Sequence, residues 1–326
     1  MRRPVRIGVI GVGALGWHHA RHLAAMPDAT LVGIYDLRPA RAAYVAAQLG
    51  CRAFATREEL LARCEAVTVA VPTSAHAEVG LASLDAGRPV LMEKPLAATL
   101  PEADRLIARA ERRGVTLQVG HIERFNPALR AAAGYLGHPL FIEGERLAPF
   151  QPRGTDVPVV LDLMIHELDL ILHLAGGPVA VDVRATGAAV LSPLLDVAHA
   201  RVEFATGLVA SVTASRIAEQ RVRRLRVYQE EGYLSLDLGT GQGEFLRLRN
   251  GWIPGHAHAL ADVAERIPLE APAADALRLE LESFLHTVRG EREAVVTATE
   301  GRAALWLALQ VAEAIRLSTP APPLSP

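Results

Sequence analysis

The chain is short of lysine, and this shortage is the most unusual feature of its composition. Lysine and arginine together number 34 among the 326 residues, and Lys94 is the single lysine, so 33 of the 34 basic residues are arginine. The guanidinium group of arginine stays protonated in proteins, whereas the amine of lysine can be tuned to titrate. A lone lysine is therefore either a chance remnant or a position whose chemistry arginine cannot supply.

The chain also has few cysteines and a small net charge. The two cysteines, Cys51 and Cys64, cannot build a disulfide framework or a zinc site by themselves, so we interpret them as reduced, partly buried thiols. The formal net charge of −2 is not typical of proteins that bind nucleic acid or anionic membranes. We therefore expect neither partner.

Long apolar runs are also missing. The most apolar stretch, residues 157–175, contains two aspartates, one glutamate and two histidines, which argues against a membrane-spanning helix. The Arg-Arg start and the apolar run after it look like an export signal, but cleavage there would also remove the glycine motif described below. We expect a cytoplasmic protein.

Short apolar, β-branched runs alternate with helical patterns in the first third of the chain. The runs occupy residues 5–10, 30–35, 66–71, 89–92 and 115–119, and the helical patterns lie between them at 15–25, 38–49, 79–86 and 100–112. Several helical patterns close at glycine, and this alternation is typical of a parallel sheet with helices on both faces. We predict an α/β Rossmann domain over residues 1–121.

The middle of the chain changes to an alternation of apolar and polar residues with a period of two, which is typical of half-buried strands. Such segments lie at 182–186, 200–205, 208–215, 222–229, 233–238 and 244–249, and they predict an antiparallel meander. Helical patterns return at 273–288 and 299–317, the second behind a capping box of Thr297 and Glu300. We predict a second, α+β domain with an open, mainly antiparallel sheet over residues 122–317, and a disordered, proline-rich tail at 318–326.

A glycine motif, Gly11-Val12-Gly13-Ala14-Leu15-Gly16, follows the first predicted strand and opens the first predicted helix. Such glycines permit a tight turn, let the backbone approach a pyrophosphate, and direct a helix N-terminus at the anion. Asp36 ends the second predicted strand, where a carboxylate can bind the adenosine ribose. The residues expected to contact a dinucleotide here are Gly11, Gly13, Ala14, Leu15, Gly16, Asp36 and Arg38.

The choice of dinucleotide depends on Asp36. Its carboxylate would repel a 2′-phosphate, so we expect NAD rather than NADP. Arg38 and Arg41 lie close enough in the sequence to keep NADP as an alternative. A Rossmann lobe that has lost its ligand is the remaining alternative.

Lys94 follows the fourth predicted strand, in the sequence Met92-Glu93-Lys94-Pro95. Ligands of open α/β sheets bind at the carboxyl ends of the parallel strands, where this lysine is expected. An amine there can donate a hydrogen bond to a substrate hydroxyl and stabilise the alkoxide that forms as hydride leaves. The alternative is a surface lysine at a strand end.

Asp162 and His166 are four residues apart in an apolar helical pattern, so they are predicted to share one helix face. Asp169 and His173 continue this polar stripe, which needs partners or a cavity on a buried helix. Three interpretations remain open: His166 is a general base, the pair binds a divalent metal, or the stripe is a hydrogen-bonded core network. We favour the base, and we expect no metal site here or at His18, His19 and His22.

These motifs together resemble the glucose-fructose oxidoreductase/inositol dehydrogenase/MocA (Gfo/Idh/MocA) family over nearly the whole chain. The matching pieces, in order, are the glycine motif, Val71-Pro72-Thr73 with His76, Glu93-Lys94-Pro95, Arg124-Phe125 with Pro127, and Asp162 with His166. The resemblance implies hydride transfer between a sugar carbinol and a nicotinamide cofactor.

Site roles follow from the same resemblance. It implies that His166 is the acid/base, that Lys94 polarises the reacting hydroxyl and that Asp162 positions the substrate. Some family members have tyrosine in place of His166, so that role depends on this local motif. Further cofactor contacts are implied for Pro72, Thr73, His76, Glu93 and Lys94.

A narrower resemblance is to the UDP-N-acetylglucosamine 3-dehydrogenases, which oxidise C3 to a ketone and prepare an aminosugar for lipid A. It is carried by the run from His121 to Pro127 and by the segment from Arg146 to Asp156. A nucleotide sugar needs cations for its diphosphate, and fork-shaped arginine side chains suit phosphate. The substrate candidates are Arg124, Asn126, Arg146 and Arg153; for Arg146 and Arg153, loop solvation or an ion pair between subunits is the alternative.

Three further expectations complete the sequence analysis. The basic run Arg216, Arg221, Arg223, Arg224 and Arg226 alternates with apolar residues, which favours a solvated strand face over a nucleic-acid site. The family resemblance implies subunit contacts through the outer sheet face, so we expect a homodimer or homotetramer. A dehydrogenase for another sugar or polyol such as inositol, and a non-catalytic NAD-binding regulator, stay open as alternative functions.

Overall fold

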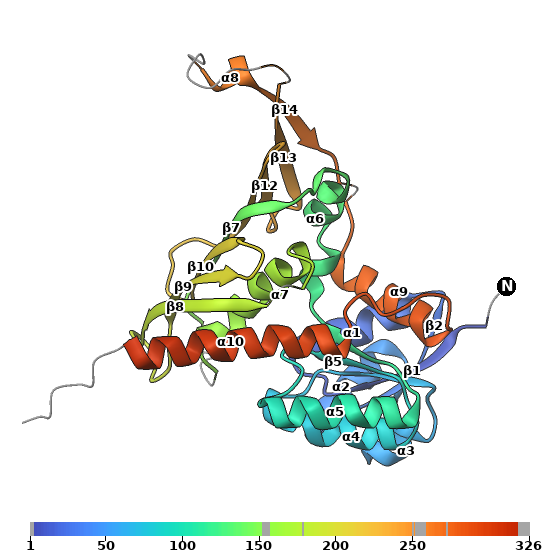
Figure 1. Ribbon diagram of the computed structural model, residues 1–326. Coiled ribbons are helices and arrows are strands. Elements are labelled where there is room, and N and C mark those ends of the chain that lie inside the picture. The colour runs from blue at the N-terminus through green and yellow to red at the C-terminus, as the bar shows by residue number, and fades with distance from the viewer. Residues whose placement is uncertain are drawn as a thin grey trace, which may run out of the picture. The chain divides into compact units, whose positions relative to one another are not determined.

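A computed structural model describes residues 3–151, 157–177, 179–249, 251, 259–271 and 273–318 (Figure 1). The chain divides into two compact units. The first consists of Met1–Ile122 and Ala274–Leu305, and the second of Glu123–Ala273 and Trp306–Pro326. The predicted boundary after residue 121 lies next to the observed one, but residues 274–305 belong to the first unit although the sequence analysis assigned them to the second domain.

The first unit contains a six-stranded, all-parallel sheet in the order β3-β2-β1-β4-β5-β6. Its strands are β1 Val5–Ile10, β2 Ala29–Tyr35, β3 Arg52–Ala53, β4 Ala66–Val69, β5 Val90–Glu93 and β6 Leu117–Gly120. Its helices are α1 Ala14–Ala25, α2 Pro39–Leu49, α3 Arg57–Leu61, the 3-10 turn Thr73–Ala75, α4 His76–Asp85, α5 Leu100–Arg113 and α9 Ala276–Val288. The predicted Rossmann architecture is confirmed.

Register brings the strand ends of this sheet together. Ile10 at the end of β1 lies beside Tyr35 of β2 and Val69 of β4, and Val69 lies beside Met92 of β5. Because all the strands are parallel, the residues that follow them share one edge of the sheet. The glycine motif begins at this edge, because Gly11 directly follows the end of β1.

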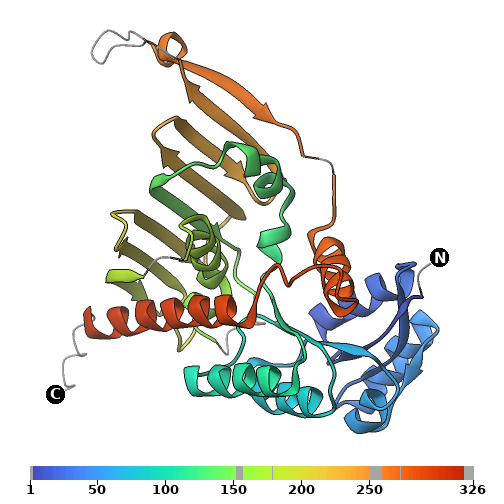
Figure 2. The same cartoon turned by 45° about the vertical axis from the view of Figure 1, so that its right-hand side comes forward.

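The core of the first unit includes residues from the far end of the chain. Leu277, Leu281, Phe284 and Leu285 of α9 are buried in one apolar cluster with residues of β1, α1 and β2. Helix α9 lies beside α1 (Figures 1 and 2). The amphipathic spacing of the α9 leucines and Phe284 explains this packing, because residues three, four and seven apart share one face.

The second unit contains an eight-stranded mixed sheet in the order β14-β13-β12-β11-β7-β10-β9-β8. Its strands are β7 Pro139–Leu147, β8 Ala180–Ala188, β9 Val197–Phe204, β10 Val209–Ser215, β11 Val222–Gln229, β12 Gly232–Asp237, β13 Gln242–Leu248 and β14 Ala264–Leu269. Its helices are α6 Pro127–Ala132, the 3-10 turn Ala133–Tyr135, the π-helical turn Val160–Met164, α7 Ile165–Leu174 and α8 Leu260–Val263, while the 3-10 turn Ile122–Phe125 and helix α10 Ala298–Ser318 span the unit boundary. The predicted open, mainly antiparallel sheet is confirmed.

The predicted simple meander is wrong at one point. Strand β7 lies between β10 and β11, antiparallel to β11 and parallel to β10, so β10 and β11 do not form a hairpin. No strand was predicted at β7, because its charged residues Glu143, Glu145 and Arg146 obscure the alternating apolar pattern.

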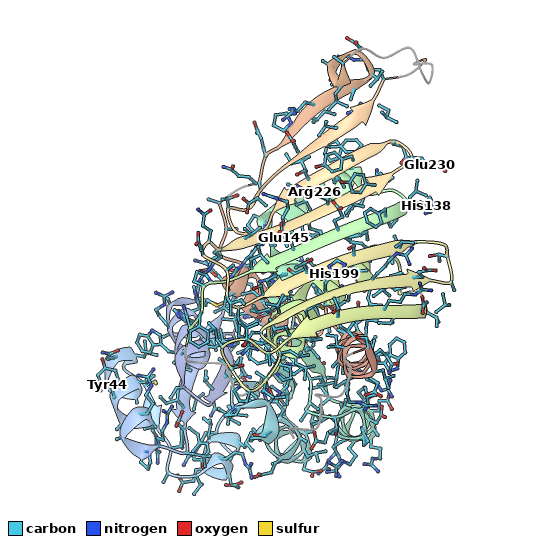
Figure 3. All side chains as sticks on the ribbon, turned by 90° about the vertical axis from the view of Figure 1, so that its left-hand side faces the viewer. Tyr44, His138, Glu145, His199, Arg226 and Glu230 are labelled. Atoms are coloured by element: carbon cyan, nitrogen blue, oxygen red, sulfur yellow. The ribbon has the colours of Figure 1, made fainter. Side chains whose placement is uncertain are left out.

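The two faces of this sheet differ. Helices α6 and α7 cover one face, the inner face (Figure 2), where Ile142, Leu225 and Val227 are buried. The opposite, outer face carries charged pairs directly across from each other, Glu145 with Arg224 and Glu143 with Arg226. Figure 3 shows this outer face, with His199, Glu145 and Arg226 labelled on three strands.

Smaller predictions can also be compared with the structure. Thr297 and Glu300 form the predicted capping box of α10, since each backbone N–H donates to the side chain of the other. Both cysteines are free thiols; Cys64 is buried and Cys51 half-buried. Within the described residues, no helix combines the length and apolarity that crossing a membrane requires.

Candidate functional site

The glycine loop of the first unit is a tight turn. Gly11 has a φ of 83°, which favours glycine, and a Cβ there would lie 2.7 Å from the carbonyl oxygen of Ala70. A Cβ on Gly16 would lie 1.9 Å from the carbonyl oxygen of Gly11, so helix α1 packs directly against the loop. At Gly13 a Cβ would meet nothing within 4 Å. The backbone at Gly13 is therefore open to a close approach by a ligand.

The N-terminus of α1 is suited to an anion. Gly13 is the N-cap residue, and no described side chain caps the backbone N–H groups that follow it at Ala14 and Leu15. The first turn contains no acidic residue. Free N–H groups and the helix dipole together favour phosphate at such a position.

Asp36 is fixed by the glycine loop and by its own turn. One carboxylate oxygen accepts a hydrogen bond from the Val12 N–H at 2.9 Å, and the other accepts from the N–H and Nε of Arg38 at 2.9 and 3.2 Å. Partial burial alone would raise the pKa of Asp36, but these hydrogen bonds outweigh it and lower that pKa. Arg41 braces the loop, because its guanidinium donates to the carbonyl oxygens of Val12 and Gly13.

A cavity of ≈ 640 Å³ lies at this edge of the sheet. It is lined by the predicted cofactor residues Gly11, Gly13, Asp36, Arg38 and Pro72, and also by Ile10, Tyr35, Leu37, Arg57, Glu58, Ala70, Val71, Ala75, Glu78 and Val79. Its position at the strand ends is the one at which open α/β sheets bind ligands. A dinucleotide fits this combination of the glycine loop, the N-terminus of α1, the fixed Asp36 carboxylate and the cavity.

Two predicted cofactor residues have structural roles beside this cavity. Thr73 begins the 3-10 turn that follows β4. The buried ring of His76 lies between two carbonyl oxygens, with Nδ1 2.8 Å from Pro95 and Nε2 3.0 Å from Val71. Burial lowers the pKa of His76. This ring therefore ties the loop after β4 to the loop after β5.

Lys94 lies where the sequence predicts it, directly after β5, and is half-buried. The peptide bond between Lys94 and Pro95 is cis. The backbone N–H of Lys94 donates to one oxygen of Glu93 at 3.2 Å. The other oxygen of Glu93 is 2.9 Å from Nε2 of His19, so this buried carboxylate is engaged inside the first unit.

In the second unit, Asp162 and His166 stand on irregular helix. Asp162 belongs to the π-helical turn Val160–Met164, in which the Ile165 N–H bonds to the carbonyl of Val160, and His166 lies in the first turn of α7. The prediction that Asp162 and His166 share one face assumed α-helical spacing, but the backbone at Asp162 is π-helical. Both side chains are half-buried, and π-helical turns are frequent at functional sites.

Buried ion pairs surround this helix. Arg146 on β7 donates from Nε to Glu167 at 2.7 and 2.9 Å and from its terminal nitrogen to Glu123 at 2.7 Å. Arg124 grips Asp169 with two hydrogen bonds of 2.6 and 2.9 Å. Asp169 of the predicted stripe is thus part of a core network, whereas His173 is exposed.

Glu167 has the most perturbed carboxyl group of this network. Burial raises its pKa to about 7; Arg146 opposes this effect and Glu123 adds to it. Gly144 makes the close packing possible, because a Cβ there would lie 3.0 Å from the Glu167 side chain. Neither Glu123 nor Glu167 was predicted as a partner of Arg146.

An arginine-rich pocket of ≈ 240 Å³ opens beside the π-helical turn, wholly within the second unit. Its lining residues are Arg146, Leu147, Ala148, Pro149, Gln151, Asp162, Leu163, Arg216, Arg221 and Arg223. Arg223 lies directly opposite Arg146 in the β7–β11 pairing. Burial and the nearby Arg146 charge lower the pKa of Arg223. We call this cavity the arginine pocket.

The arginine pocket corrects one interpretation. The basic run around β11 was expected to be a solvated strand face, yet Arg216, Arg221 and Arg223 line the pocket, and Arg216 is buried. A signal was present in the sequence: Arg223 has the same strand parity as the apolar Leu225 and Val227, which places it on the inner face.

The remaining substrate candidates lie elsewhere. Asn126 is the N-cap of α6: its side-chain oxygen accepts from the Ala128 N–H, and its amide donates to Glu123 and to the Leu238 carbonyl. Arg124 lies at the Asp169 pair. Arg153 falls outside the described residues.

Comparisons with known proteins extend these observations. A family model described as an oxidoreductase family with an NAD-binding Rossmann fold (GFO_IDH_MocA) matches residues 5–121, and the GFO/IDH/MocA C-terminal domain model matches residues 130–235. The chain is 40% identical to a UDP-N-acetylglucosamine 3-dehydrogenase of Acidithiobacillus ferrooxidans over 95% of this chain and 97% of that protein. A solved structure of that enzyme superposes with a TM-score of 0.89 at 39% identity, covering 97% of this chain and 99% of the other. A scyllo-inositol 2-dehydrogenase (NAD(+)) of Bacillus subtilis is 28% identical over 98% of this chain and 96% of its own.

Proposed function

This chain belongs to the Gfo/Idh/MocA family of oxidoreductases that act on CH–OH groups, and we propose that it oxidises the C3 hydroxyl of UDP-N-acetylglucosamine to a ketone with NAD. The similarity to the UDP-N-acetylglucosamine 3-dehydrogenase extends over nearly all of both chains. The observation in this molecule that carries the proposal is the arginine pocket beside Asp162.

The arginine pocket has the chemistry that a sugar diphosphate requires. Arg221 and Arg223 supply guanidinium groups to this wall. Arg146 is already neutralised by Glu123 and Glu167, Arg216 pairs with Asp196 at 3.8 Å, and Arg223 lies 3.8 Å from Glu123. An unmodified sugar or inositol offers no negative charge to such a wall, whereas a diphosphate forms charge-assisted hydrogen bonds with it. The cations therefore favour a nucleotide sugar over a neutral polyol.

Features of the first unit support NAD as the cofactor. The glycine loop and the N-terminus of α1, which no described side chain caps, suit the pyrophosphate. The lowered pKa of Asp36 keeps its carboxylate ionised, which suits ribose hydroxyls and disfavours the 2′-phosphate of NADP. Arg38 pairs with Asp36, and Arg41 donates to carbonyl oxygens of the glycine loop. Because both arginines are engaged in this way rather than held for a 2′-phosphate, NAD is the better match.

Lys94 and His166 have separate roles in the proposed reaction. Lys94 donates a hydrogen bond to the reacting hydroxyl and stabilises negative charge on its oxygen. His166 accepts the hydroxyl proton as general base, and Asp162 orients the sugar. Bound NAD would supply the hydride acceptor for this chemistry. The carbinol would lose its hydroxyl proton to His166 and a hydride from its carbon, and would thereby become a ketone.

The test is a substrate panel with a matched pair of variants. NAD reduction should proceed with UDP-N-acetylglucosamine at a far higher kcat/KM than with N-acetylglucosamine or inositol. Replacing Arg223 with methionine removes a pocket cation, whereas Arg224→Met on the same strand removes one from the outer face. A charge-assisted hydrogen bond contributes about 1.5–3 kcal/mol, so Arg223→Met should raise the KM for UDP-N-acetylglucosamine roughly 10–150-fold.

Three results would count against the proposal. Equal effects of Arg223→Met and Arg224→Met would mean that the pocket does not bind the diphosphate. Faster oxidation of inositol than of UDP-N-acetylglucosamine would identify a polyol dehydrogenase. Tight NAD binding with no turnover of any sugar or polyol would favour the non-catalytic regulator.

A further inference from the structure

Three titratable side chains meet in the interior of the first unit, at the end of strand β5 that Lys94 directly follows. His19 comes from α1, Glu93 from the end of β5 and Glu280 from α9. One ligand-type atom of each lies within 4.8 Å of the others. His19 and Glu280 are fully buried, and Glu93 is 7% exposed. We call this set the buried triad.

Hydrogen bonds in the buried triad are unevenly distributed. Both carboxylate oxygens of Glu93 have a partner. One accepts a hydrogen bond from the Lys94 backbone N–H at 3.2 Å, and the other lies 2.9 Å from Nε2 of His19. Neither carboxyl oxygen of Glu280 has a hydrogen-bond partner among the described residues. An ionised carboxylate in such a position is strongly destabilised, because no group among the described residues replaces its lost hydration.

We propose that Glu280 holds a proton and donates it to Glu93, so that the acid–carboxylate pair fixes the strand end from which Lys94 projects. Glu93 then accepts from three donors, one on each of the packed segments: His19, Lys94 and Glu280. Glu280 is a positioning residue, since it acts on Lys94 through Glu93. The catalytic part of this inference rests on the role proposed for Lys94; the protonation part does not.

The electrostatic surroundings support a neutral Glu280. Burial, and after it the charge of Glu93, raise the pKa of Glu280 well above its ordinary range. No cation among the described residues contributes to this shift. One oxygen of Glu280 lies within 4.8 Å of one oxygen of Glu93, and two buried carboxyl groups at such a separation share one proton rather than ionise together.

A bound metal ion is the competing explanation for the same three residues. The described residues supply three donors, whereas a structural zinc site is closed by four. A ligating histidine also donates its other ring N–H to an acceptor, but Nδ1 of His19 has no hydrogen-bond partner among the described residues. A proton satisfies the buried triad with fewer groups than a metal requires.

The variants Glu280→Gln and Glu280→Leu separate a neutral Glu280 from an ionised or metal-bound one. Glutamine keeps the shape and donates an N–H in place of the acid O–H, so Glu280→Gln should retain the melting temperature and kcat nearly unchanged. Leucine removes the donor, and Glu280→Leu should lower kcat by about 10–100-fold through misplacement of Lys94, with the Kd for NAD unchanged. If Glu280→Gln loses as much as Glu280→Leu, the proposal is overturned.

Two measurements need no substrate and therefore stand apart from the proposed function. At pH 8 the infrared spectrum should contain a protonated-carboxyl C=O band that is absent from Glu280→Gln. Elemental analysis of the purified protein should find far less than one transition-metal ion per chain. A missing band, or one zinc, manganese or iron per chain that is lost in Glu280→Gln, would refute the shared proton even if UDP-N-acetylglucosamine proves to be the substrate.

Discussion

Replacing Arg146 with methionine tests the buried ion network of the second unit. The Arg146 side chain is 4% exposed, and its guanidinium is shared by Glu167 and Glu123, which are 0% and 5% exposed. Removing this one cation leaves the buried Glu167 without its ion-pair partner, whereas Glu123 keeps Asn126 and, at 3.8 Å, Arg223. Breaking a buried pair in this way costs about 3–5 kcal/mol. For a unit of this size the melting temperature should fall by roughly 6–20 °C.

Acidification should reduce this loss. The pKa of Glu167, about 7 in the folded protein, lies above its ordinary value near 4.5, so the folded form binds the proton more tightly. The contribution of Glu167 to the free energy of unfolding is fully present below its ordinary pKa, and it is lost as pH rises through about 7. Without Arg146 the Glu167 pKa rises further, so the variant should be closest to wild type at pH 5.5 and most destabilised at pH 8.

Urea unfolding of both proteins at the two pH values measures the effect. The control is Arg266→Met, because Arg266 and Glu244 form an exposed ion pair on the same sheet. That variant should lose less than about 1 kcal/mol at either pH. Our reasoning fails if Arg146→Met is no less stable than the control, or if its loss is the same at pH 5.5 and pH 8.

The remaining predictions concern the first unit and the outer sheet face. Lys94→Arg should bind NAD with an unchanged Kd but lose about 100-fold or more of kcat, because arginine does not reproduce the amine; a fully active variant in steady-state assays would reject the assignment. Gly13→Ala should keep its melting temperature and weaken NAD binding by calorimetry, whereas Gly11→Ala should lose stability, since only Gly11 has a positive φ and a crowded Cβ position. The half-buried aromatic contact between Phe141 and Tyr228, with ring centroids 5.7 Å apart, lies on the predicted subunit interface, so light scattering at micromolar concentration should give a dimer or tetramer mass; a monomer mass would contradict this.

The first unit was predictable because its signals are local. The glycine loop, Asp36 and Lys94 each follow a strand, and parallel pairing alone brings strand ends together. Glu280 was not predictable in this way, because the chain leaves the first unit for residues 123–273 before α9 returns to it.

The second unit was predictable in class but not in its polar pairings. The partners Arg146 and Glu167 lie 21 residues apart, and Arg124 and Asp169 lie 45 apart, so no local pattern links them. Strand β7 brings Arg146 opposite Arg223. This strand was not predicted, because its charged residues interrupt the apolar alternation by which strands are recognised. The parity of Arg223 was the one local signal that pointed to the pocket.

The late segment α9 constrains how this protein is synthesised. A chain leaving the ribosome presents β1, α1 and β2 first, but the apolar cluster on them stays open until Phe284 and its neighbours have been made. At about 5–20 residues per second, translation from Ile122 to Val288 takes roughly 10–30 s. During that interval the nascent first unit exposes apolar surface that chaperones can bind, and a fragment ending near residue 122 should aggregate. Any attempt to express the cofactor-binding unit alone must therefore splice α9 back onto it.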